Sequence, residues 1–293
     1  MDMKEYLKAN AQMVEDRLNE LLPDAVVKPD AIHRAMRYSC LGGGKRLRAM
    51  LAMEACAAVG GNREAALDFA CAIEMIHAYT LIHDDLPAMD DDDYRRGKLA
   101  NHKVFGEGIA ILAGDALLTY AYEVLSSMAG VDSKAALRII NEVSTACGSQ
   151  GLIGGQVVDL ESEGQEIDLL TLEYIHRHKT GKLFSAALRG GAIIGGADED
   201  VLAELSLYGE NFGLAFQITD DILDVSGDIA KLGKATGADL RKGKSTSVSL
   251  LGLEEAKLLA EQSVDKCKRY AAKLPGKEHY LAELAEYVLK RDS

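Results

Sequence analysis

The sequence predicts an all-α protein, and three observations support that prediction. The 293-residue chain has only four prolines, and none lies between Pro87 and Pro275, so helices in this stretch need not end at proline. Its long proline-free stretches are rich in Ala, Leu, Glu and Lys, which favour helix. No segment shows a convincing alternation of apolar and polar residues, the pattern expected of strands. We expect a single domain over residues 1–293 that forms a bundle of roughly ten or more helices.

Proline and glycine delimit the helices expected in the first half. The first helix ends at Pro23, and Asp30 is a residue type that caps the start of the next helix. The run Gly42-Gly43-Gly44 ends that second helix, and the glycines at 60 and 61 end the third. A long apolar helix then leads to Asp85, and Pro87 interrupts it. The expected helices cover residues 4–22, 31–41, 45–59, 63–85 and 110–128.

Glycine also punctuates the second half. Residues 133–160 have a helical pattern, but four glycines weaken it between positions 148 and 155; such spacings often permit close helix packing. Segment 227–244 is polar and contains several glycines, so we expect a loop there. The helices expected in this half cover residues 133–160, 169–190, 200–225, 253–274 and 279–291.

Composition restricts the class of partner and the compartment. The formal net charge of −13 argues against nucleic acid, which binds to basic surfaces. It does not exclude a phosphorylated substrate, because metal ions can stand between two anionic groups. The five cysteines are scattered without a CxxC pair and are expected to be buried and reduced. Residues 1–19 do not resemble a signal peptide, and no uncharged apolar run is long enough to span a membrane. We therefore expect a cytoplasmic protein with no membrane span.

Two aspartate clusters follow apolar segments, where carboxylates are rare unless something neutralises them. In the second cluster, Asp220 and Asp224 share one helix face and Asp221 lies a quarter turn away. Two carboxylates on one face repel each other unless a cation lies between them. The alternative is a solvated acidic face, which the apolar neighbours of this cluster disfavour. Hard oxygen ligands without nearby cysteine suit Mg²⁺ or Mn²⁺.

The first cluster is divided by a proline. Asp84 and Asp85 precede Pro87, and Asp90 follows it. A straight helix would not align these groups, but a bend at the proline would return Asp90 toward Asp84. His77 lies two turns before Asp84 on the same face. A histidine in such a helix is usually a core residue, and its alignment favours a functional role.

Basic residues supply the groups for an anion. The glycine run opens into Lys45 and Arg48, three residues apart on one helix face, and free amides at a helix start attract anions. This order does not match a P-loop. Arginines beside a carboxylate cluster suit a site for metal and phosphate together. The other candidate cations are Arg95, Arg96, Lys179, Lys234 and Lys244.

Together these motifs resemble those of the trans-type (E-type) polyprenyl diphosphate synthases, with bacterial farnesyl diphosphate synthases as the nearest likeness. The resemblance covers nearly the whole chain. It departs from the family at Ala49, where proline is frequent, at Tyr94, where leucine is common, and at Ser247, where tyrosine is usual. The matching motifs are GGGKRLR at 42–48, HDDLPAMDDDDYRRG at 83–97, GGQ at 154–156, KTG at 179–181 and FQITDDILDVSGD at 216–228.

The resemblance implies an isoprenoid-synthase fold around a central active-site cavity, and a role for each motif. Six aspartates would hold three Mg²⁺ ions, which would bind the diphosphate of an allylic substrate: Asp84, Asp85, Asp90, Asp220, Asp221 and Asp224. Arg95, Lys179, Lys234 and Lys244 would complete that site. Lys45, Arg48, His77 and Arg96 match the site for isopentenyl diphosphate. Thr180 and Gln217 would lie beside the reacting allyl group, and the family is typically homodimeric.

In this family, the residues four and five positions before the first aspartate help to set product length; here they are Thr80 and Tyr79. Tyr79 lies about 7–8 Å from Asp84 along the helix axis. An aromatic residue there implies a shallow floor and a farnesyl (C15) product. Geranyl (C10) and geranylgeranyl (C20) products are the alternatives.

Three other classes share part of this pattern. Head-to-head condensing enzymes of the squalene synthase type and terpene cyclases share the all-α plan, but should lack the isopentenyl site at Lys45 and Arg48. A non-catalytic partner subunit would be expected to lose aspartates, and both clusters are intact. The sequence therefore favours a chain-elongating prenyltransferase.

Overall fold

The computed structural model describes residues 2–226 and 244–291. The all-α fold class is confirmed, because helices make up most of the described chain. Two compact units are present. Unit 1 comprises Met1–Met53 and Glu64–Ile140, and unit 2 comprises Glu54–Arg63 and Asn141–Ser293. The single domain over residues 1–293 stays a prediction.

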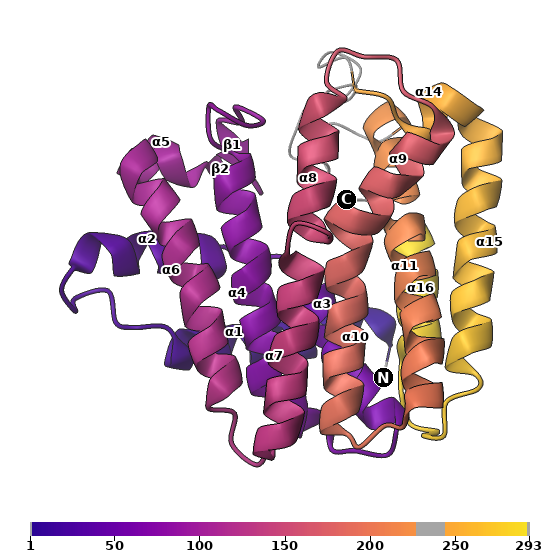
Figure 1. Cartoon of the computed structure of the whole chain (residues 1–293), viewed down its shortest axis with the longest axis horizontal. Coiled ribbons are helices and arrows are strands. Elements are labelled where there is room, and N and C mark those ends of the chain that lie inside the picture. Colours follow the sequence, from indigo (N-terminus) through magenta and orange to yellow (C-terminus); the bar gives the residue numbers. More distant parts are fainter. Residues whose placement is uncertain (1, 227–243, 292–293) are drawn as a thin grey trace. The chain divides into compact units, whose positions relative to one another are not determined.

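The helices of unit 1 pack around α4, which is apolar on almost every side. Its residues from Phe69 to Ile76 are buried, and α6 and α1 pack against it (Figure 1). The described elements are α1 (Met3–Leu21), α2 (Asp30–Cys40), α4 (Leu67–Asp84), α5 (Asn101–Phe105) and α6 (Glu107–Ser126), while α3 (Leu47–Ala58), η1 (Arg63–Ala66) and α7 (Ser133–Cys147) contribute residues to both units.

A buried arginine fixes the start of α3. Arg46 is 3% exposed and adopts a positive φ of 51°. Its guanidinium donates to Glu15 and to Glu74, 3.2 Å away, and to the carbonyl of Cys40. Because this conformation is not helical, α3 begins at Leu47 rather than at residue 45 as predicted.

A short hairpin in unit 1 was not predicted. Strands β1 (Tyr94–Arg95) and β2 (Lys98–Leu99) pair antiparallel. The two turn residues, Arg96 and Gly97, have φ values of 53° and 74°, as a type I′ turn requires. Two-residue strands are too short to show alternation in a sequence. The hairpin nevertheless matters because it carries both arginines of the first aspartate motif.

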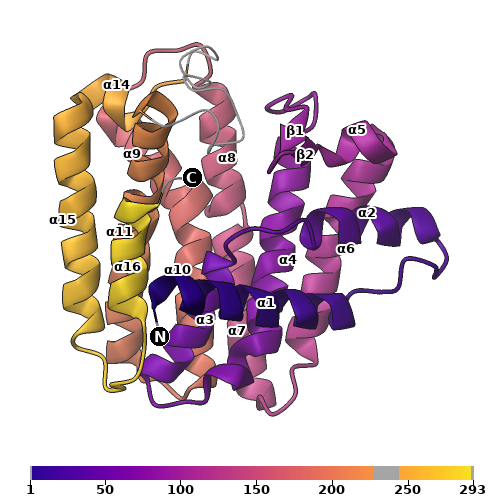
Figure 2. The same ribbon diagram turned by 180° about the vertical axis from the view of Figure 1, so that it is seen from behind.

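Unit 2 is organised around the long helix α11, which packs against α10, α15 and α16 (Figure 2). Its core holds an aromatic cluster: the ring centroids of Phe184 and Phe212 lie 5.0 Å apart, and Tyr208 stacks on Phe212. The elements are α8 (Leu152–Glu161), α9 (Leu169–Ile175), the π-helical turn η2 (His176–Gly181), α10 (Lys182–Ile194), α11 (Glu199–Ser226), α14 (Ser247–Leu251), α15 (Leu253–Ala271) and α16 (Leu281–Lys290).

Three sequence-based boundaries were wrong. Asp30 is the first residue of α2 rather than its N-cap; Pro29 holds that position. The helix predicted over 133–160 is broken between α7 and α8, where Gly151 has a non-helical φ of −123° and ψ of −129° and a Cβ would lie 2.1 Å from a backbone carbonyl oxygen. The helix predicted over 169–190 divides into α9, η2 and α10. The loop predicted over 227–244 lies outside the described residues, apart from Lys244.

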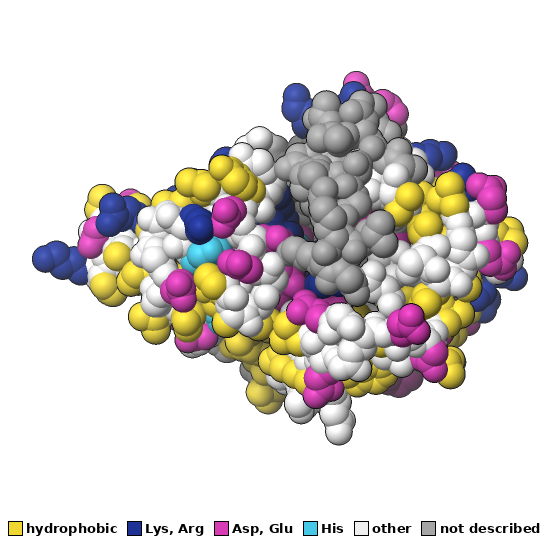
Figure 3. All heavy atoms as spheres, turned by 90° about the horizontal axis from the view of Figure 1, so that it is seen from above, with side chains coloured by type: hydrophobic (Ala, Val, Ile, Leu, Met, Phe, Trp, Pro, Cys, Tyr) yellow, Lys and Arg dark blue, Asp and Glu magenta, His cyan; other side chains and the backbone are white. Residues whose placement is uncertain are grey.

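The cysteines and the longest apolar helices fit a packed protein core. All five cysteines are buried and unoxidised, and burial raises the pKa of Cys40 and Cys147 to about 12. Two helices, residues 63–84 and α6, are long and apolar enough to cross a membrane by length and composition, and 67% of the apolar window in the first is buried. On the face shown in Figure 3, acidic side chains are scattered among basic and apolar ones.

We predict that Arg46→Leu lowers the free energy of unfolding by about 3–5 kcal/mol, because it leaves the buried Glu74 carboxylate without its cation. Denaturant titration measures the loss. Arg17→Leu is the control: Arg17 pairs with Asp68, but its side chain is 34% exposed, so about 1 kcal/mol or less should be lost. If Arg46→Leu/Glu74→Leu were no more stable than Arg46→Leu, the uncompensated charge would not be the cause.

Candidate functional site

The first aspartate cluster lies where α4 ends. Asp84 is the last residue of α4 and Asp85 is its C-cap. The amide of Asp90 donates to the carbonyl oxygen of Asp84 at 2.9 Å, and the amide of Asp91 donates to Leu86. The chain therefore turns back at the proline and returns Asp90 to Asp84, as the sequence predicted. The helix ends at this turn instead of bending through it.

The hairpin arginine neutralises the buried member of this cluster. Asp85 is 2% exposed, and its Oδ1 accepts from the Nε of Arg95 at 2.9 Å and from its second guanidinium nitrogen. Burial raises the pKa of Asp85, although Arg95 opposes the shift. A more distant contact of 3.5 Å joins Arg95 to Asp92. The hairpin thus positions one cation directly on the acidic cluster.

The predicted isopentenyl-diphosphate residues include three that the structure brings together in unit 1. Arg96 donates to the carbonyl oxygen of Gly43, so the second hairpin arginine is attached to the glycine run. Burial lowers the pKa of His77 well below its usual value, and the positive charges of Arg48 and Arg96 add to the effect. The lowered pKa favours the neutral form of His77 near these two arginines. Lys45 is partly exposed, next to the same glycine run.

Two glycines of this run have positive φ values. Gly44 has a φ of 124°, and a Cβ there would lie 2.7 Å from the guanidinium carbon of Arg96. Gly43 has a φ of 82° and no atom within 4 Å of such a Cβ. The backbone conformation therefore favours glycine at both positions, and the end of the Arg96 side chain lies close to Gly44.

The two chain-length candidates lie on α4 one turn before the cluster. Tyr79 is 6% exposed, and its ring contacts that of His83 edge to face, with centroids 5.7 Å apart. Thr80 donates from Oγ1 to the carbonyl of His77 at 2.8 Å. His83 contacts the carbonyl of Ile111 on α6 at 3.0 Å. Tyr79 is thus part of a packed layer in unit 1.

In unit 2, two members of the second aspartate cluster bind groups from other segments of the chain. Asp221 is 7% exposed and its Oδ2 accepts from the amide of Ser247 at 2.7 Å, at the start of α14. Asp224 is 5% exposed. Asp220, which is more exposed, forms an ion pair of 2.8 Å with Arg291. The partly buried setting that the apolar neighbours predicted is therefore present for Asp221 and Asp224.

Arg291 was missed by the sequence analysis. It is 6% exposed, stacks on the ring of Phe216 at 3.8 Å and donates to the Phe216 carbonyl at 2.6 Å. Burial lowers its pKa, and Asp220 opposes the shift. Nothing in local spacing points to this residue, because it is distant in the sequence from Asp220.

The KTG motif lies on the π-helical turn η2, a geometry frequent at functional sites. Thr180 donates to the Oε1 atom of Gln217 on α11, so two of the three predicted catalytic residues, which also include Lys179, meet. Gly213 explains this approach, because a Cβ there would lie 2.7 Å from the Cα of Gly181. Because Gly213 and Gln217 are one turn apart on α11, the contact aligns Gln217 with Thr180.

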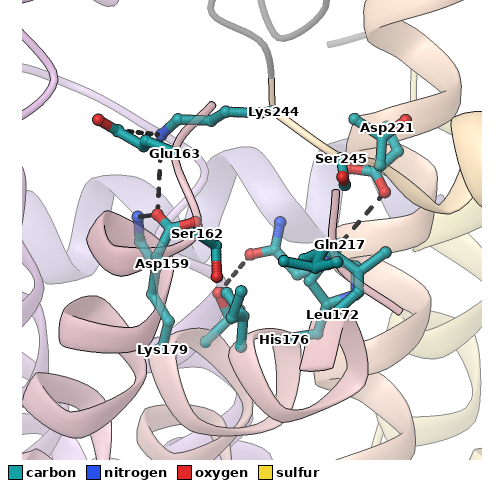
Figure 4. A pocket seen from close by; sticks show the side chains of 14 residues that line it. Asp159, Ser162, Glu163, Leu172, His176, Lys179, Gln217, Asp221, Lys244 and Ser245 are labelled. Atoms are coloured by element: carbon teal, nitrogen blue, oxygen red, sulfur yellow. Dashed lines mark hydrogen bonds and ion pairs between the residues drawn. The ribbon is translucent and has the colours of Figure 1, made fainter. Parts of the chain in front are cut away.

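Beside this contact lies a polar pocket of about 150 Å³ (Figure 4). Lys179 and Lys244 both reach it, and both bind Asp159, at 2.5 and 3.7 Å. Asp159 was missed by the sequence analysis. The sequence did contain a signal for it: Asp159 follows the GGQ motif by three residues. Gly155 of that motif and Asp159 are four residues apart, so they share one face of α8. Lys234 lies outside the described residues.

Comparison with known proteins identifies the family. The family model described as polyprenyl synthetase matches residues 29–285. The chain belongs to this family. A dimethylallyltranstransferase from Fischerella ambigua is 47% identical over 99% of this chain and 84% of its own length. A geranylgeranyl diphosphate synthase from Cyanophora paradoxa is 44% identical (98% and 96% covered), and a farnesyl diphosphate synthase from Geobacillus stearothermophilus is 42% identical (100% and 99% covered).

Solved structures of the family have the same fold. A farnesyl/geranylfarnesyl diphosphate (FPP/GFPP) synthase from Zymomonas mobilis has a TM-score of 0.87 at 38% identity, with 98% of this chain and 99% of that one covered. A geranyltransferase from Helicobacter pylori, complexed with magnesium and isoprenyl diphosphate, has a TM-score of 0.85 at 32% identity (98% and 96% covered). The resemblance inferred from the motifs is confirmed, and the chain is a prenyltransferase.

The donors present fit the hard cations that the family resemblance implies. Asp85, Asp221 and Asp224 are buried carboxylates, and such oxygen ligands suit Mg²⁺. Within residues 2–226 and 244–291, no three acidic, histidine or cysteine side chains are arranged to hold an ion by themselves. Mg²⁺ commonly uses one or two carboxylates together with substrate phosphates, so the substrate would supply the remaining oxygens.

We predict that Gly213→Ala separates Thr180 from Gln217. The added Cβ would force apart two backbones and cost about 1–3 kcal/mol of stability, and kcat should fall roughly tenfold or more because the reacting group loses its alignment. Gly181→Ala is the matched control, since its Cβ would have no contact closer than 3.6 Å. Equal losses of kcat in both variants would show that the close contact is not the cause.

Proposed function

We propose that this prenyltransferase joins isopentenyl diphosphate head-to-tail (1′-4) to dimethylallyl and then geranyl diphosphate, giving farnesyl diphosphate. The observation that supports the proposal is that the chain contains both acidic clusters and a separate cationic group. Each aspartate cluster includes a buried carboxylate, and a separate group of cations gathers at the glycine run. A terpene cyclase or a head-to-head condensing enzyme has no need of that second cationic group. Intact aspartates in both clusters also disfavour a non-catalytic subunit.

In this proposal, the allylic diphosphate is bound through the acidic clusters and the nearby cations. Asp84, Asp85 and Asp90, with Asp220, Asp221 and Asp224, would hold Mg²⁺, with Mn²⁺ as an alternative and three ions per site. When bound, these ions would supply positive charge that stabilises the leaving diphosphate. Lys179, Lys244 and Arg95 would bind the same oxygens, and Lys234 would join them. These charges favour the state in which the carbon–oxygen bond has broken.

The remaining residues would guide the cation to its partner. Thr180 and Gln217 place polar oxygens beside the allylic cation, and apolar helices keep bulk water away. Lys45, Arg48 and Arg96, with neutral His77, would hold isopentenyl diphosphate. Its alkene electrons then form the new carbon–carbon bond. A proton leaves to restore a double bond, and the departing diphosphate is a suitable base.

The test is an assay of the purified chain with isopentenyl diphosphate and each allylic starter. We predict condensation that requires Mg²⁺, stops with excess EDTA and returns when Mg²⁺ is restored, because the acidic clusters otherwise repel the diphosphate. Chromatography of the dephosphorylated products identifies the chain length. Absence of any condensation under these conditions would contradict the prenyl-transfer proposal, and a C10 or C20 product would contradict only its C15 part.

The C15 assignment depends on the pocket floor. Tyr79 is buried on α4 with its ring against His83, so we propose that it limits the growing chain, with Thr80 beside it. The relatives include both farnesyl and geranylgeranyl synthases, which makes the C20 product the main alternative.

We predict that Tyr79→Ala shifts the main product to C20 or longer, because removing the ring opens space for another isoprene unit. Tyr79→Phe keeps the ring and should keep C15. Product chromatography at equal conversion measures the shift. Thermal unfolding should be checked in parallel, since truncating a buried aromatic residue costs about 3–5 kcal/mol. An unchanged C15 product from a folded Tyr79→Ala variant would exclude Tyr79 as the floor.

We further propose a cytoplasmic homodimer. Only 39% of the apolar window of α6 is buried, and Ile111 and Leu112 are 44% and 53% exposed. A second copy of the chain would cover this helix, as expected for an isologous contact. Light scattering should give twice the 31.5 kDa chain mass, and Leu112→Glu should halve it. Leu137→Glu, at an exposed leucine on α7, should leave the dimer intact.

A further inference from the structure

The pocket beside η2 contains a carboxylate that the mechanism above does not use. Asp159 lies on α8, and its Oδ2 atom lies 2.5 Å from the Nζ of Lys179 and 3.7 Å from the Nζ of Lys244. Glu163, one turn further along, lies 3.6 Å from Lys244 through its Oε1. Figure 4 shows the two lysines converging on Asp159 from opposite sides. The positive charges of the two lysines are therefore offset by the negative charges of Asp159 and Glu163.

The position of Asp159 is fixed by backbone packing. A Cβ at Gly155 would lie 2.2 Å from the amide nitrogen of Lys179, so α8 packs directly against η2. Gly155 and Asp159 are four residues apart on the same face of α8. The side chains of Asp159 and Lys179 are 17% and 24% exposed, so this pair is only partly accessible to solvent.

These lysines are also the groups that should bind the diphosphate. An ammonium already hydrogen-bonded to a carboxylate cannot direct the same proton to phosphate. A diphosphate entering this pocket also meets the negative charge of Asp159. We propose that Asp159 is a counter-anion for Lys179 and Lys244, which release it when diphosphate binds and return to it when pyrophosphate leaves. This inference rests on the proposed function, because it requires that these lysines bind diphosphate.

Such a residue would act on binding and release without touching the reacting carbon atoms. Asp159 would lower the affinity for pyrophosphate, because each binding event must break its contacts with two lysines. It would also keep the lysines positioned between turnovers. It is therefore a positioning residue, and removing its charge should tighten pyrophosphate binding rather than weaken it.

The test is calorimetric titration of inorganic pyrophosphate into wild type and Asp159→Asn, first without divalent metal and then with Mg²⁺. We expect the variant to bind at least about tenfold more tightly without metal, about 1.4 kcal/mol. Asp159→Glu, which keeps the charge, should stay near wild type. Glu161→Gln is the charge-matched control, since Glu161 is an exposed carboxylate on the same helix. If Asp159→Asn does not fold, Asp159→Ser serves for the same measurement.

Kinetics separate release from chemistry. In Asp159→Asn, the inhibition constant of pyrophosphate should fall by the same factor as the dissociation constant. In the Glu161→Gln control, both constants and the single-turnover condensation rate should stay within about twofold of wild type. Unchanged or weaker pyrophosphate binding without metal would overturn the inference, as would a loss confined to Mg²⁺-dependent binding, which would make Asp159 a metal ligand. Wild-type condensation tests the proposed function separately, since pyrophosphate titration requires no turnover.

Discussion

Charged groups inside a largely apolar helical fold need partners of opposite charge, and this constraint organises both units. An isolated buried charge is so costly that it would shift its pKa or unfold its surroundings. Three buried carboxylates show this, because each accepts hydrogen bonds from a cation or a backbone amide. Glu74 is matched by Arg46, and Asp85 by Arg95. Asp221 is matched by the amide of Ser247.

These pairings differ in what they do for the protein. Arg46 and Glu74 are both almost fully buried, so a substrate cannot reach them. Their ion pair stabilises the fold. Asp159 and Lys179 are partly exposed beside a pocket, where an incoming anion can exchange with the carboxylate. The same electrostatic requirement thus gives a permanent contact in the core and an exchangeable one at the site.

Glycines also position the site, because they let two backbones approach closely enough for short polar contacts. Gly155 allows α8 to reach the amide of Lys179, and Gly213 allows α11 to reach Gly181. Both contacts converge on η2, so its π-helical turn is held from two sides. Lys179 and Thr180, which we propose act on the substrate, are thereby placed on a rigid support, and such groups need positions held within about half an ångström.

The sequence by itself determined the helical class, the family and the motif residues, because periodicity, proline spacing and local motifs are properties of neighbouring residues. It also indicated that the chain turns back at Pro87 to bring Asp90 toward Asp84. Only the tertiary structure decided that Asp159 pairs with the lysines and that Arg291 pairs with Asp220. Those partners are distant in the chain, and nothing in local spacing specifies which charge will neutralise which. The hairpin at Arg95 and the break at Gly151 were missed for a related reason: short strands and steric contacts with backbone depend on three-dimensional packing rather than on composition.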